Sequence, residues 1–215
     1  MHAWDLAPAE AVALQRKLSR QVRRRGRPAH IACVAGVDVG FEQDGMITKA
    51  AVAILSFPQL ELVEVRVNRI RTCFPYVPGL LSFRELPAVL PAFERLERLP
   101  DLVLCDGQGY AHPRRFGIAC HLGVLLDVPT IGIGKTRLLG RHAAVPDRRG
   151  ASTPLLHDGK VIGAVLRTRA GVRPLYISVG HRIGLTHALD IVMDCTTRFR
   201  LPEPIRAAHR EASCH

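Results

Sequence analysis

Two aspartates stand in surroundings that are otherwise apolar. Asp38 lies inside the β-branched run of residues 31–41, and Asp106 closes the apolar run of residues 101–106. Burying an ionised carboxylate is costly unless a partner compensates, and two such groups on adjacent strands repel each other strongly. Because Mg²⁺ prefers carboxylate oxygens and keeps waters for chemistry, the pair predicts a magnesium site. A turn cap or an arginine partner for Asp38, and an Asp-Gly turn for Asp106, are the structural alternatives.

Three further side chains could serve the same chemistry. Glu85 offers a third carboxylate, although Ser82 gives it the S-x-x-E spacing of a helix capping box, which is a structural alternative. Lys135 could offer a cation to a phosphate, in a glycine-rich run that lacks the P-loop pattern. His209 is a lone histidine, which by itself is more often a surface residue than a catalyst. Together with a divalent metal, such a set is suited to phosphodiester hydrolysis.

Composition and charge narrow the class of protein. The 215 residues are 47% hydrophobic and 23% charged, which is typical of a folded globular protein and fits one domain over residues 1–215. Lys and Arg number 30 against 19 Asp and Glu, so the formal net charge is +11. A surplus of that size favours a polyanionic partner such as nucleic acid. We expect the arginine-rich region 1–28 to be a basic helix that belongs to the same domain.

The cysteine spacing, the N-terminal residues and the apolar segments together predict where in the cell the protein is found. The six cysteines form no CxxC pair, and the first 14 residues are mixed and carry Asp5 and Glu10, unlike a signal peptide. The longest apolar region, residues 118–134, is interrupted by His121, Asp127 and Pro129 and indicates core rather than a membrane span. We therefore expect a cytoplasmic protein with no membrane segment.

The order of elements predicts the fold class. Residues 31–41, 50–57 and 60–70 indicate three strands of an antiparallel meander, followed by a loop at residues 74–81. Further strands are expected at 101–106, 130–133, 161–167 and 175–179, helices at 5–25, within 82–99, and at 114–126, 186–199 and 204–212, and a surface loop at 147–159. This order predicts an α/β fold, a ribonuclease H-like mixed sheet of three antiparallel strands followed by parallel strands, flanked by helices.

Several sequence blocks in a fixed order identify a family. These blocks are Ala35-Gly36-Val37-Asp38-Val39-Gly40-Phe41, Pro75-Tyr76-Val77-Pro78-Gly79, Leu81-Ser82-Phe83-Arg84-Glu85, Asp106-Gly107, His112-Pro113-Arg114-Arg115, Asp127-Val128-Pro129-Thr130-Ile131-Gly132, Gly180-His181-Arg182 and Leu201-Pro202-Glu203-Pro204-Ile205-Arg206. Through them the chain resembles endonuclease V from about residue 34 to residue 212. Each block alone would be a weak signal, but their shared order is specific.

The resemblance implies a reaction and roles for residues. It implies a DNA repair endonuclease that uses Mg²⁺, with Mn²⁺ as a substitute, to hydrolyse the second phosphodiester bond 3′ to deoxyinosine and leave a 3′-hydroxyl and a 5′-phosphate. Asp38 and Asp106 become metal ligands, Glu85 supports the metal or the water, and His209 becomes a candidate for positioning the attacking water or a second metal. We expect a monomer.

The resemblance also implies how the lesion is recognised. Tyr76, between two prolines, becomes a wedge that enters the duplex where the base has been extruded. The expected binding residues for the base and its phosphate are Gly79, Leu81, His112, Gly117, Ile118 and Lys135. Gln108 and Gly134 depart from residues common in the family, and the sequence does not assign them a role.

Three alternatives remain open at this stage. A structure-specific nuclease of the same fold would share the carboxylates but leave the wedge around Tyr76 unexplained. A non-catalytic nucleic-acid binder would be expected to lack at least one of Asp38, Glu85 and Asp106, and all three are present. Inosine-containing RNA remains an alternative substrate, because recognition of ribose depends on contacts to the 2′-hydroxyl that no motif reports.

Overall fold

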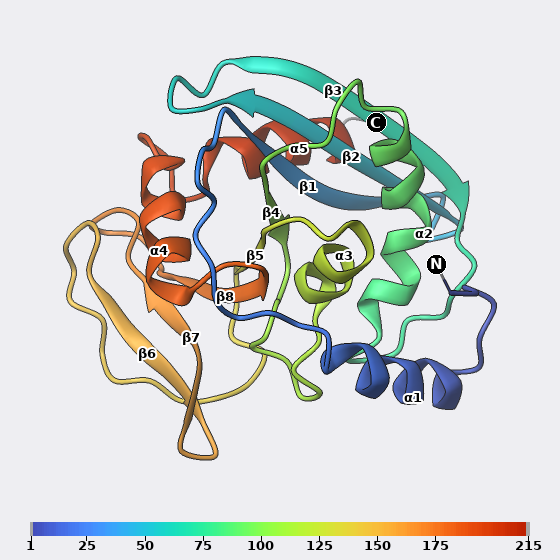
Figure 1. Cartoon of the computed structure of the whole chain (residues 1–215), viewed down its shortest axis with the longest axis horizontal. Coiled ribbons are helices and arrows are strands. Elements are labelled where there is room, and N and C mark those ends of the chain that lie inside the picture. Colours follow the sequence, from blue (N-terminus) through green and yellow to red (C-terminus); the bar gives the residue numbers. More distant parts are fainter. Residues whose placement is uncertain (1, 214–215) are drawn as a thin grey trace.

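One eight-stranded mixed sheet organises the molecule. The computed structural model describes residues 2–213, so Met1, Cys214 and His215 lie outside the described part of the chain. The strands are β1 (Cys33–Glu42), β2 (Ile47–Ser56), β3 (Leu62–Arg71), β4 (Leu102–Asp106), β5 (Thr130–Gly134), β6 (Ser152–His157), β7 (Lys160–Leu166) and β8 (Leu175–His181). They are arranged in the order β3-β2-β1-β4-β5-β8-β7-β6 (Figure 1).

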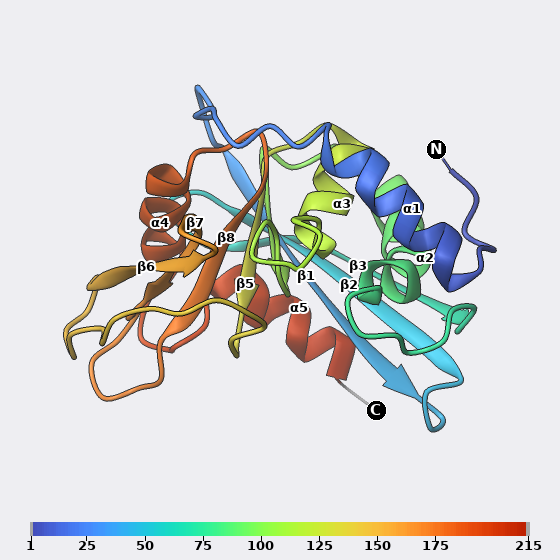
Figure 2. The same ribbon diagram turned by 90° about the horizontal axis from the view of Figure 1, so that it is seen from below.

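Helices cover both faces of this sheet. They are α1 (Pro8–Ser19), α2 (Leu81–Glu94), α3 (Ile118–Leu126), α4 (Leu185–Asp194) and α5 (Glu203–Ser213). The apolar side chains of α2 and α3 pack on one face of β1, β2 and β4, and α1 lies outside them (Figure 2). The helices α4 and α5 pack on the opposite face. Among residues 2–213 no helix is both long and apolar enough to cross a membrane.

The strand pairing confirms the predicted mixed α/β sheet. The pairs β1–β2 and β2–β3 are antiparallel, whereas β1–β4 and β4–β5 are parallel. The last three strands are antiparallel to their neighbours, so the sheet ends in a second antiparallel set. In the β1–β4 register Val37 stands opposite Cys105, which places Asp38 and Asp106 next to each other one step further along. Two carboxylates distant in sequence therefore meet at the same level of the sheet.

Two glycines of β1 allow α5 to lie almost against the strand. A Cβ atom at Gly36 would stand 1.9 Å from the carbonyl oxygen of Pro204, and one at Gly40 would stand 2.5 Å from that of Ala212. Both positions are on the same face of β1 as Asp38, which lies midway between them. The helix can therefore follow the strand closely enough to bring its own side chains to Asp38.

Four predicted elements have different limits in the structure. The N-terminal helix ends at Ser19 rather than near residue 25, and the helix expected from residue 114 begins at Ile118. The helix expected to reach residue 199 ends at Asp194. The predicted surface loop at residues 147–159 is wrong in part, because it contains β6. That edge strand pairs with β7 and buries only Leu155, so the polar and turn-rich composition around it favoured a loop.

Candidate active site

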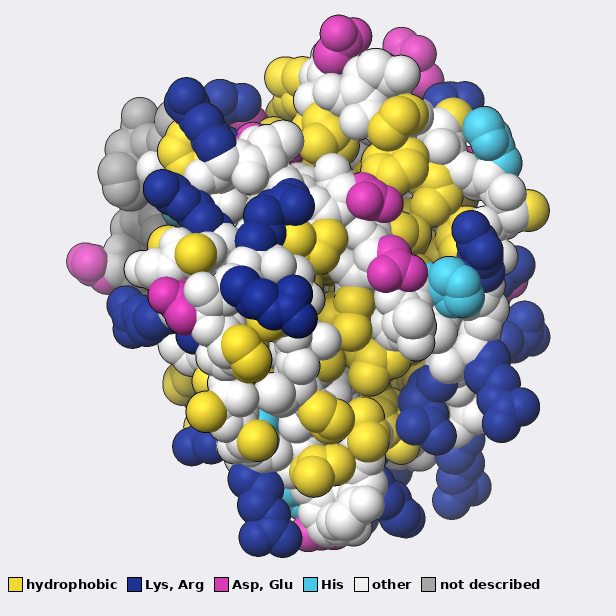
Figure 3. Space-filling model, turned by 90° about the vertical axis from the view of Figure 1, so that its left-hand side faces the viewer, with side chains coloured by type: hydrophobic (Ala, Val, Ile, Leu, Met, Phe, Trp, Pro, Cys, Tyr) yellow, Lys and Arg dark blue, Asp and Glu magenta, His cyan; other side chains and the backbone are white. Residues whose placement is uncertain are grey.

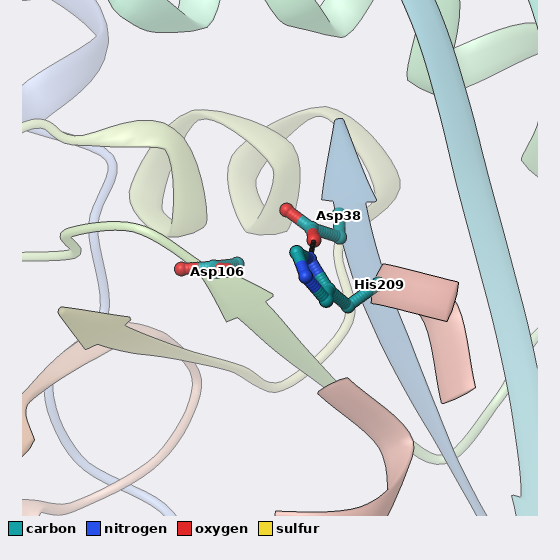
Figure 4. A group of neighbouring side chains, drawn as sticks. All are labelled: Asp38, Asp106 and His209. Carbon is teal, nitrogen blue, oxygen red and sulfur yellow. Dashed lines mark hydrogen bonds and ion pairs between the residues drawn. The ribbon is translucent and has the colours of Figure 1, made fainter. Parts of the chain in front are cut away.

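Three ligand-type side chains meet where β1, β4 and α5 come together. The ligand atoms of Asp38, Asp106 and His209 all lie within 4.8 Å of one another. Figure 4 shows His209 reaching from α5 toward Asp38 of β1, with Asp106 at the end of β4 beside them. The Nδ1 atom of His209 is 2.5 Å from Oδ2 of Asp38, and Oδ1 of Asp38 accepts a hydrogen bond from the backbone N–H of Val39 at 2.9 Å.

The burial of the three groups differs. Asp38 is 9% exposed and the Asp106 side chain is 12% exposed, whereas half of the His209 side chain faces solvent. The carboxylates therefore form the floor of the site and the imidazole its open side. His209 is thus not the isolated surface residue that its sequence context suggested.

Asp106 is buried beside a second carboxylate, and this environment raises its pKa. Burial raises the pKa of this carboxyl to about 6, and the negative charge of Asp38 contributes to the rise. Lys135 opposes it, because its Nζ forms an ion pair with Oδ2 of Asp106. One ammonium thus offsets only part of the repulsion between the carboxylates.

Glu85 lies in α2, on the other face of the sheet from His209. It is 7% exposed, and burial, followed by the charges of Asp38 and Asp106, holds its pKa well above the usual value for a glutamate. The capping-box alternative does not hold, because α2 begins at Leu81 and the buried Ser82 hydroxyl is instead hydrogen-bonded to Nδ1 of His121 at 2.9 Å. Glu85 is therefore a third buried carboxyl, whose pKa is raised mainly by its burial and further by the charges of the other two.

This donor set fits a divalent cation. Two carboxylates and one imidazole whose ligand atoms lie within 4.8 Å can converge on one ion, and oxygen-rich sites of this kind suit Mg²⁺ or Mn²⁺. A cation would also relieve the repulsion that raises the pKa values of Asp106 and Glu85. Glu85 lies outside the group of three, so it could act on a metal from its periphery or through water.

A pocket of about 250 Å³ opens directly beside the cluster, starting at Gly107. It is lined by Gln15, Tyr76, Val77, Pro78, Gly79, Leu81, Ser82, Gly107, Gln108, His112, Phe116, Gly117, Ile118, Thr136, Arg137 and Leu138. All six of the residues predicted from the sequence for the wedge and the base pocket are in this set. Lys135, the seventh predicted binding residue, lies outside it and contacts Asp106.

The backbone carbonyl of Gly79 is the best-anchored group of the pocket. It accepts hydrogen bonds from Gln15 Nε2 at 3.0 Å, His112 Nε2 at 3.1 Å and Arg114 Nη2 at 2.6 Å. The other ring nitrogen of His112 accepts the backbone N–H of Arg114 at 3.2 Å, which assigns the ring proton to Nε2. Burial lowers the pKa of His112 to about 4, so this ring is neutral at pH 7. His112 therefore holds the pocket wall through its backbone partners.

The loop that carries Tyr76 projects away from this anchored wall. The Tyr76 side chain is 72% exposed at the rim of the pocket, while Phe74 and Leu80 on either side of the loop are buried. Gly79 adopts φ +79°, a conformation that residues with a side chain rarely adopt. The loop thus has two fixed ends and an exposed aromatic tip.

Comparison with known proteins decides the family. A family model described as Endonuclease V matches residues 16–210 of the chain. An endonuclease V from Trichormus variabilis is 54% identical over 213 residues, which cover 99% of this chain and 96% of the relative. The crystal structure of endonuclease V from Streptomyces avermitilis superposes with a TM-score of 0.92 at 40% identity, covering 98% of this chain and 93% of that one. The chain belongs to the endonuclease V family.

Membership in the endonuclease V family makes the chain an endonuclease and confirms the predicted ribonuclease H-like fold class. A further member of the family has been crystallised with nucleic acid. Endonuclease V from Ciona intestinalis was solved in complex with a 24mer DNA containing an inosine followed by a ribo-adenosine. It superposes with a TM-score of 0.83 at 26% identity, covering 94% of each chain.

The two departures from common endonuclease V residues are coupled in space. Gln108 donates from Nε2 to the carbonyl oxygen of Thr136 at 3.1 Å, which ties the loop after Asp106 to the segment that carries Lys135. A Cβ atom at Gly134 would stand 2.1 Å from that same Nε2. The glutamine therefore occupies space that only a glycine at position 134 leaves open.

Sequence reasoning missed several pocket residues in this endonuclease V family member. The S-x-x-E spacing predicts a cap for Ser82, and the basic N-terminal region predicts phosphate contacts but no pocket residue such as Gln15. Gln15 is 1% exposed. The sequence carries no local signal for it, because Gln15 is followed directly by Arg16 and Lys17 and its burial is known only from the structure.

Proposed function

We propose that this protein is a DNA repair endonuclease that hydrolyses the second phosphodiester bond on the 3′ side of deoxyinosine. Cleavage leaves a 3′-hydroxyl and a 5′-phosphate and depends on Mg²⁺, for which Mn²⁺ substitutes. The observation that carries the proposal is the cluster of Asp38, Asp106 and His209 beside a pocket large enough for one base. A family member bound to inosine-containing DNA supports the choice of substrate.

In the proposed hydrolysis, the carboxylates of the cluster bind the metal ion and the histidine positions the attacking water. Asp38 and Asp106 would hold the metal ion, with Glu85 supporting it from α2. When bound, Mg²⁺ supplies Lewis-acid activation and neutralises charge that develops on the phosphate. His209 donates from Nδ1 to Asp38, which leaves Nε2 as an acceptor able to orient the attacking water and take its proton. The P–O3′ bond then breaks, and the leaving 3′ oxygen takes up a proton.

The pocket side would bind the lesion and the phosphates beside it. The extruded base would lie between the Gly79–Leu81 wall and the Gly117–Ile118 wall, with His112 holding the first of these through its backbone. Tyr76 would fill the gap left in the duplex, because an aromatic ring recovers part of the lost stacking. Lys135 is close enough to Asp106 to offer its ammonium to the scissile phosphate.

The rest of the surface supports binding to a polyanion. Figure 3 shows Lys and Arg side chains spread around an apolar strip on the side of the molecule that is at the left of Figure 1. This agrees with the net charge of +11. We further propose that residues 1–215 act as one domain that includes region 1–28, and that the protein is a cytoplasmic monomer.

Cleavage of end-labelled substrates tests the proposal. The purified protein is incubated with duplexes that carry one deoxyinosine or none, and with an inosine-containing RNA, in Mg²⁺ and in chelator. We expect a metal-dependent nick between the first and second nucleotides 3′ of the deoxyinosine, and none in the undamaged duplex. Faster cleavage of the RNA would reassign the substrate. No cleavage by folded protein would instead favour the non-catalytic binding role.

A further inference from the structure

A buried glutamine of α1 makes hydrogen bonds to two residues of the pocket lining and to Arg114. Gln15 Nε2 donates to the carbonyl oxygen of Gly79 at 3.0 Å and to that of Phe116 at 3.1 Å, and Oε1 accepts from Arg114 Nε at 2.5 Å. Both amide hydrogens and the amide oxygen are therefore used. The side chain is 1% exposed, and Ala11 is the only other buried residue of α1. A polar group buried in this way is stable only while its partners stay in place.

Two partners of Gln15 belong to separate segments of the pocket lining. Gly79 ends the loop that carries Tyr76, whereas Phe116 precedes Gly117, the N-cap residue of α3. Between Gln15 and these segments, Arg114 adds a second link, since its Nη2 also donates to the Gly79 carbonyl. One amide thus sets the spacing between the wall that ends the wedge loop and the wall that begins α3.

The position of Gln15 separates this role from that of its arginine-rich neighbours. The residues around it in α1, such as Arg16 and Lys17, are exposed and can act only on distant phosphates or solvent. Gln15 lies one residue before the segment that matches the endonuclease V family model, which spans residues 16–210. The contribution of α1 to the pocket is therefore made by its one buried polar side chain.

We propose that Gln15 is a positioning residue for lesion specificity, which holds the two pocket walls at the spacing that accepts a deaminated base and rejects undamaged DNA. This inference rests on the proposed function, because it concerns the same pocket. The catalytic carboxylates are outside the network, so Gln15 acts on recognition and leaves the chemical step largely unchanged.

Two substitutions at position 15 and one matched control test the role. Gln15→Met keeps the length of the side chain and removes all three hydrogen bonds. Gln15→Glu keeps an acceptor for Arg114 but replaces both donations with an oxygen that faces two carbonyl oxygens. Gln21→Met makes the same chemical change at an exposed glutamine just after α1. Full-length proteins are compared after circular dichroism has established that each is folded.

The readout separates binding from chemistry. Fluorescence anisotropy in chelator gives the affinity ratio between a deoxyinosine duplex and an undamaged duplex, and single-turnover cleavage at saturating enzyme with Mg²⁺ gives the rate of the chemical step. We expect both Gln15 variants to lose about tenfold in the affinity ratio, the size expected for two lost hydrogen bonds. The single-turnover rate should fall by less than about threefold, and Gln21→Met should match the wild type.

Several results would overturn the inference. An unchanged affinity ratio in Gln15→Met, or a wild-type ratio in Gln15→Glu, would mean that donation to the two carbonyls does not set the specificity. A loss confined to the single-turnover rate would place the effect on chemistry instead. If the wild-type protein itself neither prefers nor cleaves deoxyinosine, the proposed function fails first, and this outcome is distinct from the others.

A variant at a second position of the network provides the test if the Gln15 variants do not fold. Arg114 is only partly buried, and Arg114→Gln removes its contacts to Gly79 and to Gln15 from the outer side of the network. It should lower the affinity ratio in the same direction with a similar single-turnover rate. An unchanged ratio in a folded Arg114→Gln protein would contradict the network as the source of specificity.

Discussion

The cluster around Asp38 and the pocket beside it are built in opposite ways, although they are adjacent. In the cluster, two carboxylates lie side by side and burial raises the pKa of Asp106 to about 6, so a bound cation would stabilise their charged forms. In the pocket, neutral side chains such as His112 and Gln15 hold backbone carbonyls, and no ion is required. Recognition and chemistry should therefore be separable by experiment.

The largest expected effect comes from removing one carboxylate of the cluster. Asp38→Asn or Asp106→Asn should lower the single-turnover cleavage rate by roughly a thousandfold, because the metal site loses a charged ligand. Binding to the deoxyinosine duplex in chelator should remain close to that of the wild type. Gel-resolved cleavage and anisotropy measure the two quantities. Normal turnover by either variant would contradict the metal assignment.

Removing the exposed aromatic tip should affect the pocket side alone. Tyr76→Ala should weaken binding to a deoxyinosine duplex by about tenfold, since stacking of an aromatic ring on bases is worth about 1–3 kcal/mol. A single strand that contains deoxyinosine leaves no gap to fill, so its affinity should change much less. Parallel titrations of the two substrates give the comparison, and equal losses on both would argue against a wedge.

A methyl group at position 134 should disturb the boundary between the two regions. Gly134→Ala places a Cβ 2.1 Å from Nε2 of Gln108 and should displace this side chain from Thr136. We expect cleavage to slow by several-fold, because the segment that carries Lys135 loses that tie. The double variant with Gln108→Ala should be no worse than Gln108→Ala alone. Additive losses in this double-mutant cycle would show that the two positions are independent.

Lowering the pH should reduce the free energy of unfolding through the buried side chain of His121. Burial lowers the pKa of His121 to about 3, against 6.5 for an unperturbed histidine. Below pH 6.5 His121 is therefore protonated in the unfolded chain but stays neutral in the folded chain. Protonation thus stabilises the unfolded state, and the contribution of His121 to the free energy of unfolding should fall by about 2 kcal/mol by pH 5. Urea denaturation across this pH range measures the slope. His121→Asn should flatten it, and an equally steep slope in that variant would refute this origin.

The sequence predicted the carboxylates well because their signal is local. An aspartate inside an apolar strand is conspicuous, and the strand order alone was enough to place Asp38 beside Asp106. The structure adds the register, in which Val37 faces Cys105, and this pairing cannot be obtained from composition. The predicted mixed sheet was confirmed, whereas the polar edge strand β6 was missed because its partner β7 supplies most of its stabilising contacts.

Residues whose role depends on distant partners were harder to predict. His209 had no local signal, because its significance comes from the close approach of α5 to Gly36 and Gly40. Gln15 was overlooked for the same reason, since its partners lie about 64 and 101 positions away in the chain. The family resemblance indicated residues that line the pocket, but it did not indicate Gln15, which holds two of the lining segments through hydrogen bonds.

The packing of α5 on β1 has a consequence for how the enzyme is made. Asp38 belongs to the first strand, whereas His209 belongs to a helix that follows all eight strands in the chain. During synthesis the strands that carry the two aspartates are thus made before the helix that carries the histidine. The group of Asp38, Asp106 and His209 is therefore complete only once α5 has been made and has packed on β1.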